Sequence, residues 1–175
     1  MLAPYLLALC RIVIGLIFMI SFTGKVRNLP AFENAISHFR LLPAWAEKPV
    51  ALLSLVGEFV VIILLVSGNR FLSVGFGLGA LLLTIFSVAL ISVLKRSIQT
   101  SCNCFGLTER PVSRSDIARN VGFASCALCG LILVVPGADR RSLSVVEWAL
   151  AGFPAAVFVA VWLHIGEIIR IFERG

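Results

Sequence analysis

Charged side chains are scarce in this sequence. Only 14% of its 175 residues are Asp, Glu, Lys or Arg, whereas soluble domains carry roughly 25%. Hydrophobic residues make up 59% of the chain. The polar segments around residues 25–48 and 95–119 are each too short to build a hydrophobic core of their own. This composition excludes a soluble enzyme and predicts an integral membrane protein.

Apolar runs of the length that a bilayer requires, about 20 residues in a helix, recur along the chain. They predict an all-α, polytopic membrane helix bundle of about five transmembrane helices, forming a single domain over residues 1–175. No basic residue precedes the first run and no small-x-small cleavage site follows it, so we expect it to be a span rather than a signal peptide. The predicted spans are residues 4–24, 49–67, 71–94, 119–137 and 146–169.

A shorter helix is predicted in the first polar segment. Between Pro30 and Leu42, the apolar residues Phe32, Ile36 and Phe39 recur at helical spacing, with polar residues between them. We expect an amphipathic helix that lies on the membrane surface, with an ordered re-entrant turn as the alternative.

Small residues mark the fourth predicted span. Gly122, Cys126 and Gly130 recur at every fourth position, and such a stripe lets a second helix approach closely. We therefore expect this span to be the buried member of the bundle.

Lys and Arg are distributed unevenly between the polar segments. Eleven follow the first, third and fifth spans, and three lie on the opposite side. The positive-inside rule then predicts an extracytoplasmic N-terminus and two cytoplasmic loops in a bacterial inner or plasma membrane. Because these charges are scattered between spans rather than gathered on one face, we expect the lipid bilayer, and no nucleic acid, as a binding partner.

Two cysteines in the second long polar segment are the first candidates for chemistry. Cys102 and Cys104 are separated by one residue, so a disulfide between them closes a small, strained ring that exchanges readily. Arg110 and Arg114 lie nearby and favour the nucleophilic thiolate. The pattern favours an exchange pair without a metal ion; two incidental loop cysteines and a metal site are the alternatives.

The remaining cysteines fall inside predicted spans. Cys126 and Cys129 are one helical turn apart on one helix face. They are either packing residues or a redox relay within reach of a membrane quinone, which is the one cofactor that the sequence suggests. A zinc site built from both pairs would place two ligands in hydrocarbon. Cys10 stands alone near the opposite face and is interpreted as a packing residue.

Two charged residues lie within predicted spans, Arg11 in the first and Glu58 in the second. An isolated charge there costs about 2.5–3.5 kcal/mol, so each needs a partner. The predicted spans are antiparallel neighbours, and the two residues differ in depth by about 5–6 Å. We predict that Arg11 is the buried partner of Glu58. The alternative is functional, with Glu58 as a proton acceptor beside a redox site.

Several short motifs follow one another between Arg11 and Asn120. They are Gly24-Lys25, Phe39-Arg40-Leu41-Leu42-Pro43, Glu58, Cys102-Asn103-Cys104-Phe105-Gly106 and Arg119-Asn120. In this order they resemble the methylamine-utilisation MauE family, within the broader MauE/DoxX group of redox-associated membrane proteins. The Cys-x-Cys-Phe-Gly segment makes the resemblance fairly specific.

The resemblance implies a role in maturing the small, disulfide-rich subunit of periplasmic methylamine dehydrogenase beside a thioredoxin-like partner. Together with the residues, it predicts thiol–disulfide exchange on an exported, disulfide-containing client, with Cys102 and Cys104 as the exchanging pair. A non-catalytic assembly factor and a quinone-linked thiol oxidoreductase, with Cys126 and Cys129 as its relay, are the alternatives. Whether the protein is itself an enzyme stays open. A periplasmic client places the exchange pair outside, whereas the charge count places it inside.

Overall fold

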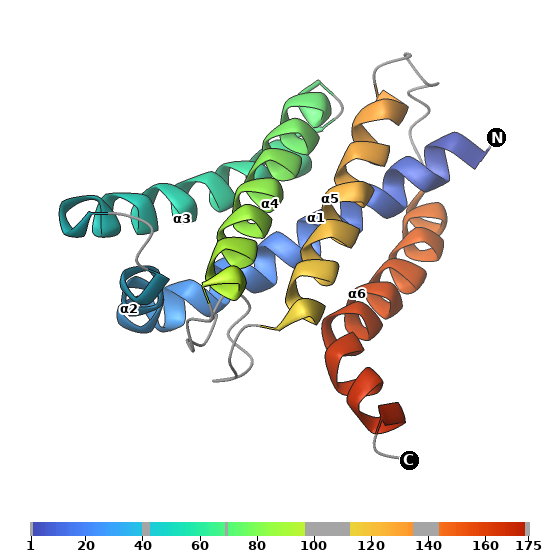
Figure 1. Ribbon diagram of the computed structural model, residues 1–175. Helices are drawn as coiled ribbons and strands as arrows, with labels where there is room; N and C mark the ends of the chain where they lie inside the picture. The colour runs from blue at the N-terminus through green and yellow to red at the C-terminus, as the bar shows by residue number, and fades with distance from the viewer. Residues whose placement is uncertain (1, 40–42, 69, 97–112, 135–143, 174–175) are drawn as a thin grey trace.

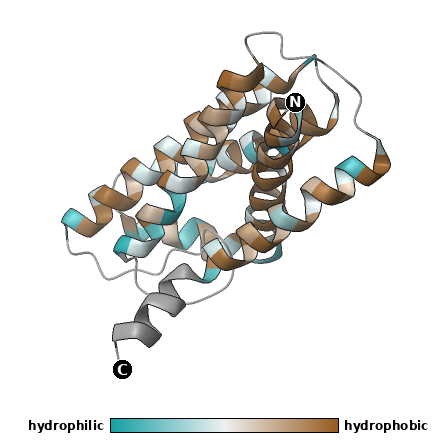
Figure 2. Cartoon of the chain, turned by 90° about the vertical axis from the view of Figure 1, so that its right-hand side faces the viewer, coloured by the Kyte–Doolittle hydropathy of each residue, from teal (hydrophilic) through white to brown (hydrophobic). Residues whose placement is uncertain are grey.

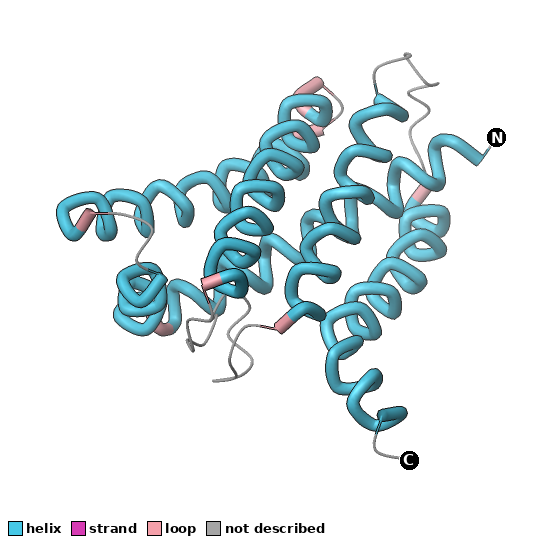
Figure 3. Tube along the Cα trace, viewed as in Figure 1, coloured by secondary structure: helices cyan, strands magenta, loops and turns pink. Residues whose placement is uncertain are grey.

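The computed structural model describes residues 2–39, 43–68, 70–96, 113–134 and 144–173 (Figure 1). Every regular element in these ranges is a helix, and none of them is a strand (Figure 3). The predicted all-α bundle is therefore confirmed. The helices are α1 (Leu2–Arg27), α2 (Leu29–Phe39), α3 (Ala44–Val66), α4 (Leu72–Lys95), α5 (Arg114–Val134) and α6 (Val145–Glu173).

Five of these helices are long and apolar enough to cross a membrane: α1, α3, α4, α5, and α6 between Val145 and His164. Apolar residues cover most of each long helix (Figure 2). The protein is therefore a multi-pass membrane protein. The chain alternates in direction, so the C-terminal end of α1, α2, the end of α4 and the start of α5 lie at one end of the bundle (Figure 1).

Several helices begin earlier than predicted, and local hydrogen bonds explain two of these starts. The backbone N–H of Ser113 donates to the carboxylate of Asp116 at 2.9 Å, and that of Ser144 donates to Glu147 at 2.7 Å. These are capping-box contacts, which satisfy N–H groups that a helix start leaves without partners. They set the starts of α5 and α6. The first predicted span likewise continues to Arg27.

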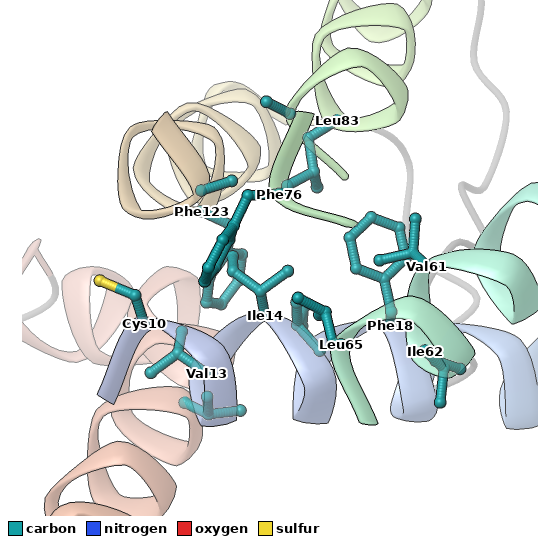
Figure 4. Packing of buried hydrophobic residues seen from close by; sticks show 14 of the residues in the cluster. Cys10, Val13, Ile14, Phe18, Val61, Ile62, Leu65, Phe76, Leu83 and Phe123 are labelled. Atoms are coloured by element: carbon teal, nitrogen blue, oxygen red, sulfur yellow. The ribbon is translucent and has the colours of Figure 1, made fainter. Parts of the chain in front are cut away.

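The centre of the bundle is α1, which packs against each of the other five helices. Its Val13, Ile14 and Phe18 lie in one apolar core with residues of α3, α4 and α5 (Figure 4). The expectation that the fourth span is the buried one is wrong. Gly122 of α5 faces α6 and Gly130 faces α4, so the small residues do not form one stripe against one neighbour.

The predicted amphipathic helix exists as α2, and the predicted residues beyond Phe39 lie outside the described ranges. Its Phe32, Ala35 and Phe39 are buried against the bundle. Phe39 packs with Leu90 and with other residues of α4 and α5. The helix thus covers one end of the bundle, and its apolar face is used for packing within the protein.

Candidate functional site

Lys25 lies in the last turn of α1, and its side chain is fully buried (0% exposed). It forms an ion pair with Glu58 of α3, and its ammonium lies 3.5 Å from the hydroxyl of Ser54. The rings of Phe86 and Phe32 face the ammonium at 4.4 and 4.7 Å from their centroids. The charge is therefore held by an opposite charge, a hydroxyl and two aromatic faces.

Glu58 is also fully buried, and its two carboxylate oxygens have different surroundings. Oε1 accepts hydrogen bonds from Lys25 and from Ser21, the latter at 2.9 Å. Among the described residues, Oε2 has no hydrogen-bond partner, and neither has Oδ1 of the buried Asn120. Both residues line a small cavity of about 10 Å³, close to the space of one water molecule. A proton or a water molecule between these two acceptors would satisfy both.

These residues form one centre at the end of the bundle that α2 covers. We call Ser21, Lys25, Ser54, Glu58 and Asn120 the Lys25–Glu58 centre. Buried charge inside membrane helices is costly and is found mostly at sites that bind or transfer something. The centre combines a fixed cation, a carboxylate with one available oxygen, and a cavity beside that oxygen, which is an arrangement suited to accepting a proton.

Arg11 is not the partner of Glu58, and that prediction is wrong. Its Nε donates to the carbonyl of Leu65 at 2.6 Å, and a terminal nitrogen donates to that of Val66 at 3.3 Å. Its guanidinium also lies 5.3 Å from the ring centroid of Trp148. The two carbonyls end α3, where a cation interacts favourably with the helix dipole. Arg11 thus caps the C-terminus of α3.

The Arg11–Glu58 pairing was wrong because the predicted ends of the first two spans differ from those of α1 and α3. The prediction closed the first span at Gly24 and opened the second at Pro49, but α1 runs to Arg27 and α3 begins at Ala44. Pro49 lies inside α3, five residues beyond its start, where its missing N–H removes one hydrogen bond to the first turn without ending the helix. With the helices extended, Ser21 lies opposite Glu58, and Arg11 lies opposite Leu65. Glu58 and Leu65 are seven residues apart, about 10 Å along a helix.

Lys25 and Asn120 belong to the motifs that resemble the MauE family, but the sequence does not predict their place in the site. A signal was present for Lys25: Ile14, Phe18, Ser21 and Lys25 follow one another at steps of four, three and four, which keeps them on one helix face. Asn120 was expected to open a helix. It lies six residues beyond the start of α5, and nothing in the local sequence marks its neighbour across the bundle.

Cys102 and Cys104 lie outside the described residues, so their predicted exchange role is untested. The helices on either side are described: α4 ends at Lys95 and α5 begins at Arg114. Both of these helix ends lie at the end of the bundle that carries the Lys25–Glu58 centre (Figure 1). The chain segment with the exchange pair is therefore joined to the bundle on the side of the buried ion pair.

The three described cysteines lie together, and Cys10 is not alone. Cys10 of α1 belongs to the buried apolar core, and Cys126 and Cys129 of α5 pack against the same core, with the three thiols close enough to interact electrostatically. All three are free thiols. They lie in the half of the bundle away from the Lys25–Glu58 centre. A role of Cys126 and Cys129 as a relay is untested.

Comparison with known proteins identifies the family. The sequence profile described as methylamine utilisation protein MauE matches residues 3–133. The chain belongs to the MauE family. It is 33% identical over 138 residues to the methylamine utilization protein MauE of Paracoccus denitrificans, covering 76% of this chain and 74% of that protein. No solved structure matches the chain. The range shared with the MauE family includes the Lys25–Glu58 centre and all five cysteines, and it ends before α6.

Proposed function

We propose that this MauE-family protein supports thiol–disulfide exchange during the maturation of an exported, disulfide-containing protein. Cys102 and Cys104 are the exchanging pair, and a thioredoxin-like protein is the redox partner. When the pair becomes a disulfide, its two thiols give two electrons and two protons to the disulfide of the partner, which leaves as a dithiol; the reverse reaction oxidises the partner. Methylamine utilisation, named in the family description, is the proposed pathway.

The observation that carries the proposal is the Lys25–Glu58 ion pair, buried at the end of the bundle where the cysteine-bearing segment joins α4 and α5. A thiol must lose its proton before it attacks a disulfide as the thiolate, so an exchange site benefits from a nearby proton acceptor. Glu58 has one available oxygen beside a cavity that Asn120 shares. Asn120 is six residues from the start of α5, about 9 Å of helix. Glu58 is the proposed acceptor, and Lys25 and Ser21 are positioning residues that hold its carboxylate.

Serine variants in cells that make the client test the proposal. Cys102→Ser or Cys104→Ser should trap or abolish mixed disulfides with the thioredoxin-like partner and lower the yield of correctly bridged client. The amount of protein in the membrane should not change. The measurement is acid quenching followed by thiol labelling with a mass tag, read on the protein and on its client.

The control for this experiment is the pair Cys126→Ser and Cys129→Ser, which leaves the exchange pair intact and should leave client maturation unchanged. The decisive variant changes both Cys102 and Cys104. If it supports full client maturation while the wild-type pair stays reduced throughout, thiol exchange is excluded. The non-catalytic assembly factor then takes its place.

We also propose that the N-terminus is extracytoplasmic and the Cys102–Cys104 segment cytoplasmic. Lys25 is buried in the bundle, so we exclude it from the count of Lys and Arg residues in the polar segments. Ten of these residues then lie on the proposed cytoplasmic side and three on the opposite side. Intact cells carrying Cys104 as the single cysteine should not react with a membrane-impermeant maleimide, and lysed cells should. Labelling of intact cells would reverse the orientation.

A further inference from the structure

Three cysteines from two packed helices share one apolar core inside the bundle, and the proposed exchange reaction does not use them. Cys10 of α1 is buried, with 2% of its surface exposed. Cys126 and Cys129 of α5, which packs on α1, lie against the same core, and Cys10 interacts electrostatically with both, principally with Cys126. We call these residues the thiol cluster. Because α1 and α5 are distant in sequence, only the fold brings these sulfur atoms together.

The surroundings of the thiol cluster are apolar. Val13, Ile14, Phe76, Phe123 and Ala127 belong to the same buried core. Across the described ranges, no three histidine, cysteine or acidic side chains are arranged to hold a metal ion. Formation of a disulfide between neighbouring thiols is the chemistry that this donor set supports.

The depth of the cluster determines what can react with it. Cys126 lies twelve residues beyond the start of α5 and eight before its described end, about 18 and 12 Å of helix respectively. A thioredoxin-like protein works from the aqueous phase and does not enter a membrane helix bundle to this depth. A reactant must therefore be soluble in the lipid.

The cluster borders the outer surface of the bundle on α5. Cys126 and Cys129 are half-buried. Each directly follows a residue of the exposed face of this helix, which includes Val121, Leu128 and Ile132. In a membrane protein that face contacts lipid tails. The two α5 thiols can thus be reached from the bilayer, while Cys10 stands behind them.

We propose that Cys10 and Cys126 form a reversible disulfide between α1 and α5, with a membrane-soluble quinone as the oxidant. Two S–H bonds break and one S–S bond forms. The two electrons and two protons pass to the two carbonyl oxygens of the quinone, which leaves as a quinol. Cys129 stays reduced in this reaction. The proposal concerns a second redox site, separate from Cys102 and Cys104, and it stands whether or not these two residues exchange with a client.

Counting free thiols tests the proposal directly. The full-length protein carrying Cys102→Ser and Cys104→Ser keeps three of its five cysteines. It is placed in lipid nanodiscs and exposed to a short-chain ubiquinone analogue. Acid quenching, denaturation and labelling with a mass-tagged maleimide then report the free thiols. We expect three tags before and one after, with one quinol formed for each protein molecule oxidised.

Matched variants in the same background assign the bond. Cys10→Ala and Cys126→Ala should each keep two tags after quinone, because each lacks one member of the disulfide. Cys129→Ala should fall from two tags to none. Three tags that persist in the background protein would overturn the quinone reaction. Loss of both tags in the Cys10→Ala variant would show that the disulfide joins Cys126 and Cys129 within α5. Loss of both tags in the Cys126→Ala variant would show that it joins Cys10 and Cys129. Either result overturns the Cys10–Cys126 assignment.

Discussion

The Lys25–Glu58 centre and the thiol cluster occupy opposite halves of the same bundle, and they show two ways of placing polar atoms in a membrane. In the centre, Lys25 and Glu58 are fully buried, and hydroxyls and aromatic rings surround the pair. In the thiol cluster, neutral side chains sit among apolar neighbours. A charge needs arranged partners in lipid, whereas a thiol behaves as a small apolar group. The centre therefore fixes how α1 and α3 align, while the thiol cluster leaves α1 and α5 able to form the proposed disulfide.

The largest expected effect comes from removing one charge of the centre. Lys25→Leu and Glu58→Leu should each lower the free energy of unfolding by about 3–5 kcal/mol, because the remaining charge is stranded. The double variant should be close to wild type. Unfolding in mixed micelles with increasing SDS measures all three.

Arg11 provides the control for this cycle. It lies opposite Leu65 rather than Glu58, so Arg11→Leu and Glu58→Leu should lower stability additively. If the Arg11 cycle shows strong coupling and the Lys25 cycle shows none, the alignment of α1 and α3 described above is wrong.

A smaller effect is expected beside the thiol cluster, where α5 approaches α4. A Cβ at Gly130 would lie 2.5 Å from the ring of Phe76, which is fully buried. Gly130→Ala should therefore cost about 1–3 kcal/mol of unfolding free energy. Gly77→Ala is the matched control, since nothing lies within 4 Å of its Cβ position, and alanine favours a helix over glycine by up to about 1 kcal/mol. Equal stability of the two variants would contradict the close approach of α5 to Phe76.

The smallest effect is expected at Cys10. Cys10→Ala removes one buried sulfur atom and strands no charge, so it should cost about 1 kcal/mol or less under reducing conditions. The same SDS titration, carried out with excess reductant, measures it. A loss of unfolding free energy as large as that of Lys25→Leu would show that the thiols are coupled as tightly as the ion pair. It would contradict the difference described between the two halves of the bundle.

The sequence predicts most of the fold because long apolar runs and amphipathic periodicity reflect whether a segment is surrounded by lipid, water or protein. That information is contained within each segment of the chain. It predicts the partners in the site poorly. Lys25 follows an apolar run and looks like its end, although the helix continues. Cys10 looks isolated until α5 is packed beside α1. Such pairs depend on how two helices align, and an error of a few residues at a helix end moves a side chain by a full turn or more.

The buried ion pair also bears on how the protein enters the membrane. Taken singly, α1 carries Lys25 and α3 carries Glu58, and each charge opposes insertion of its own helix by about 2.5–3.5 kcal/mol at the centre of a span and by less near its ends. Together the two charges neutralise each other inside the protein. The two helices are therefore more readily delivered to the lipid as a hairpin than one after the other, and α2 between them has only to fold over the end of the finished pair.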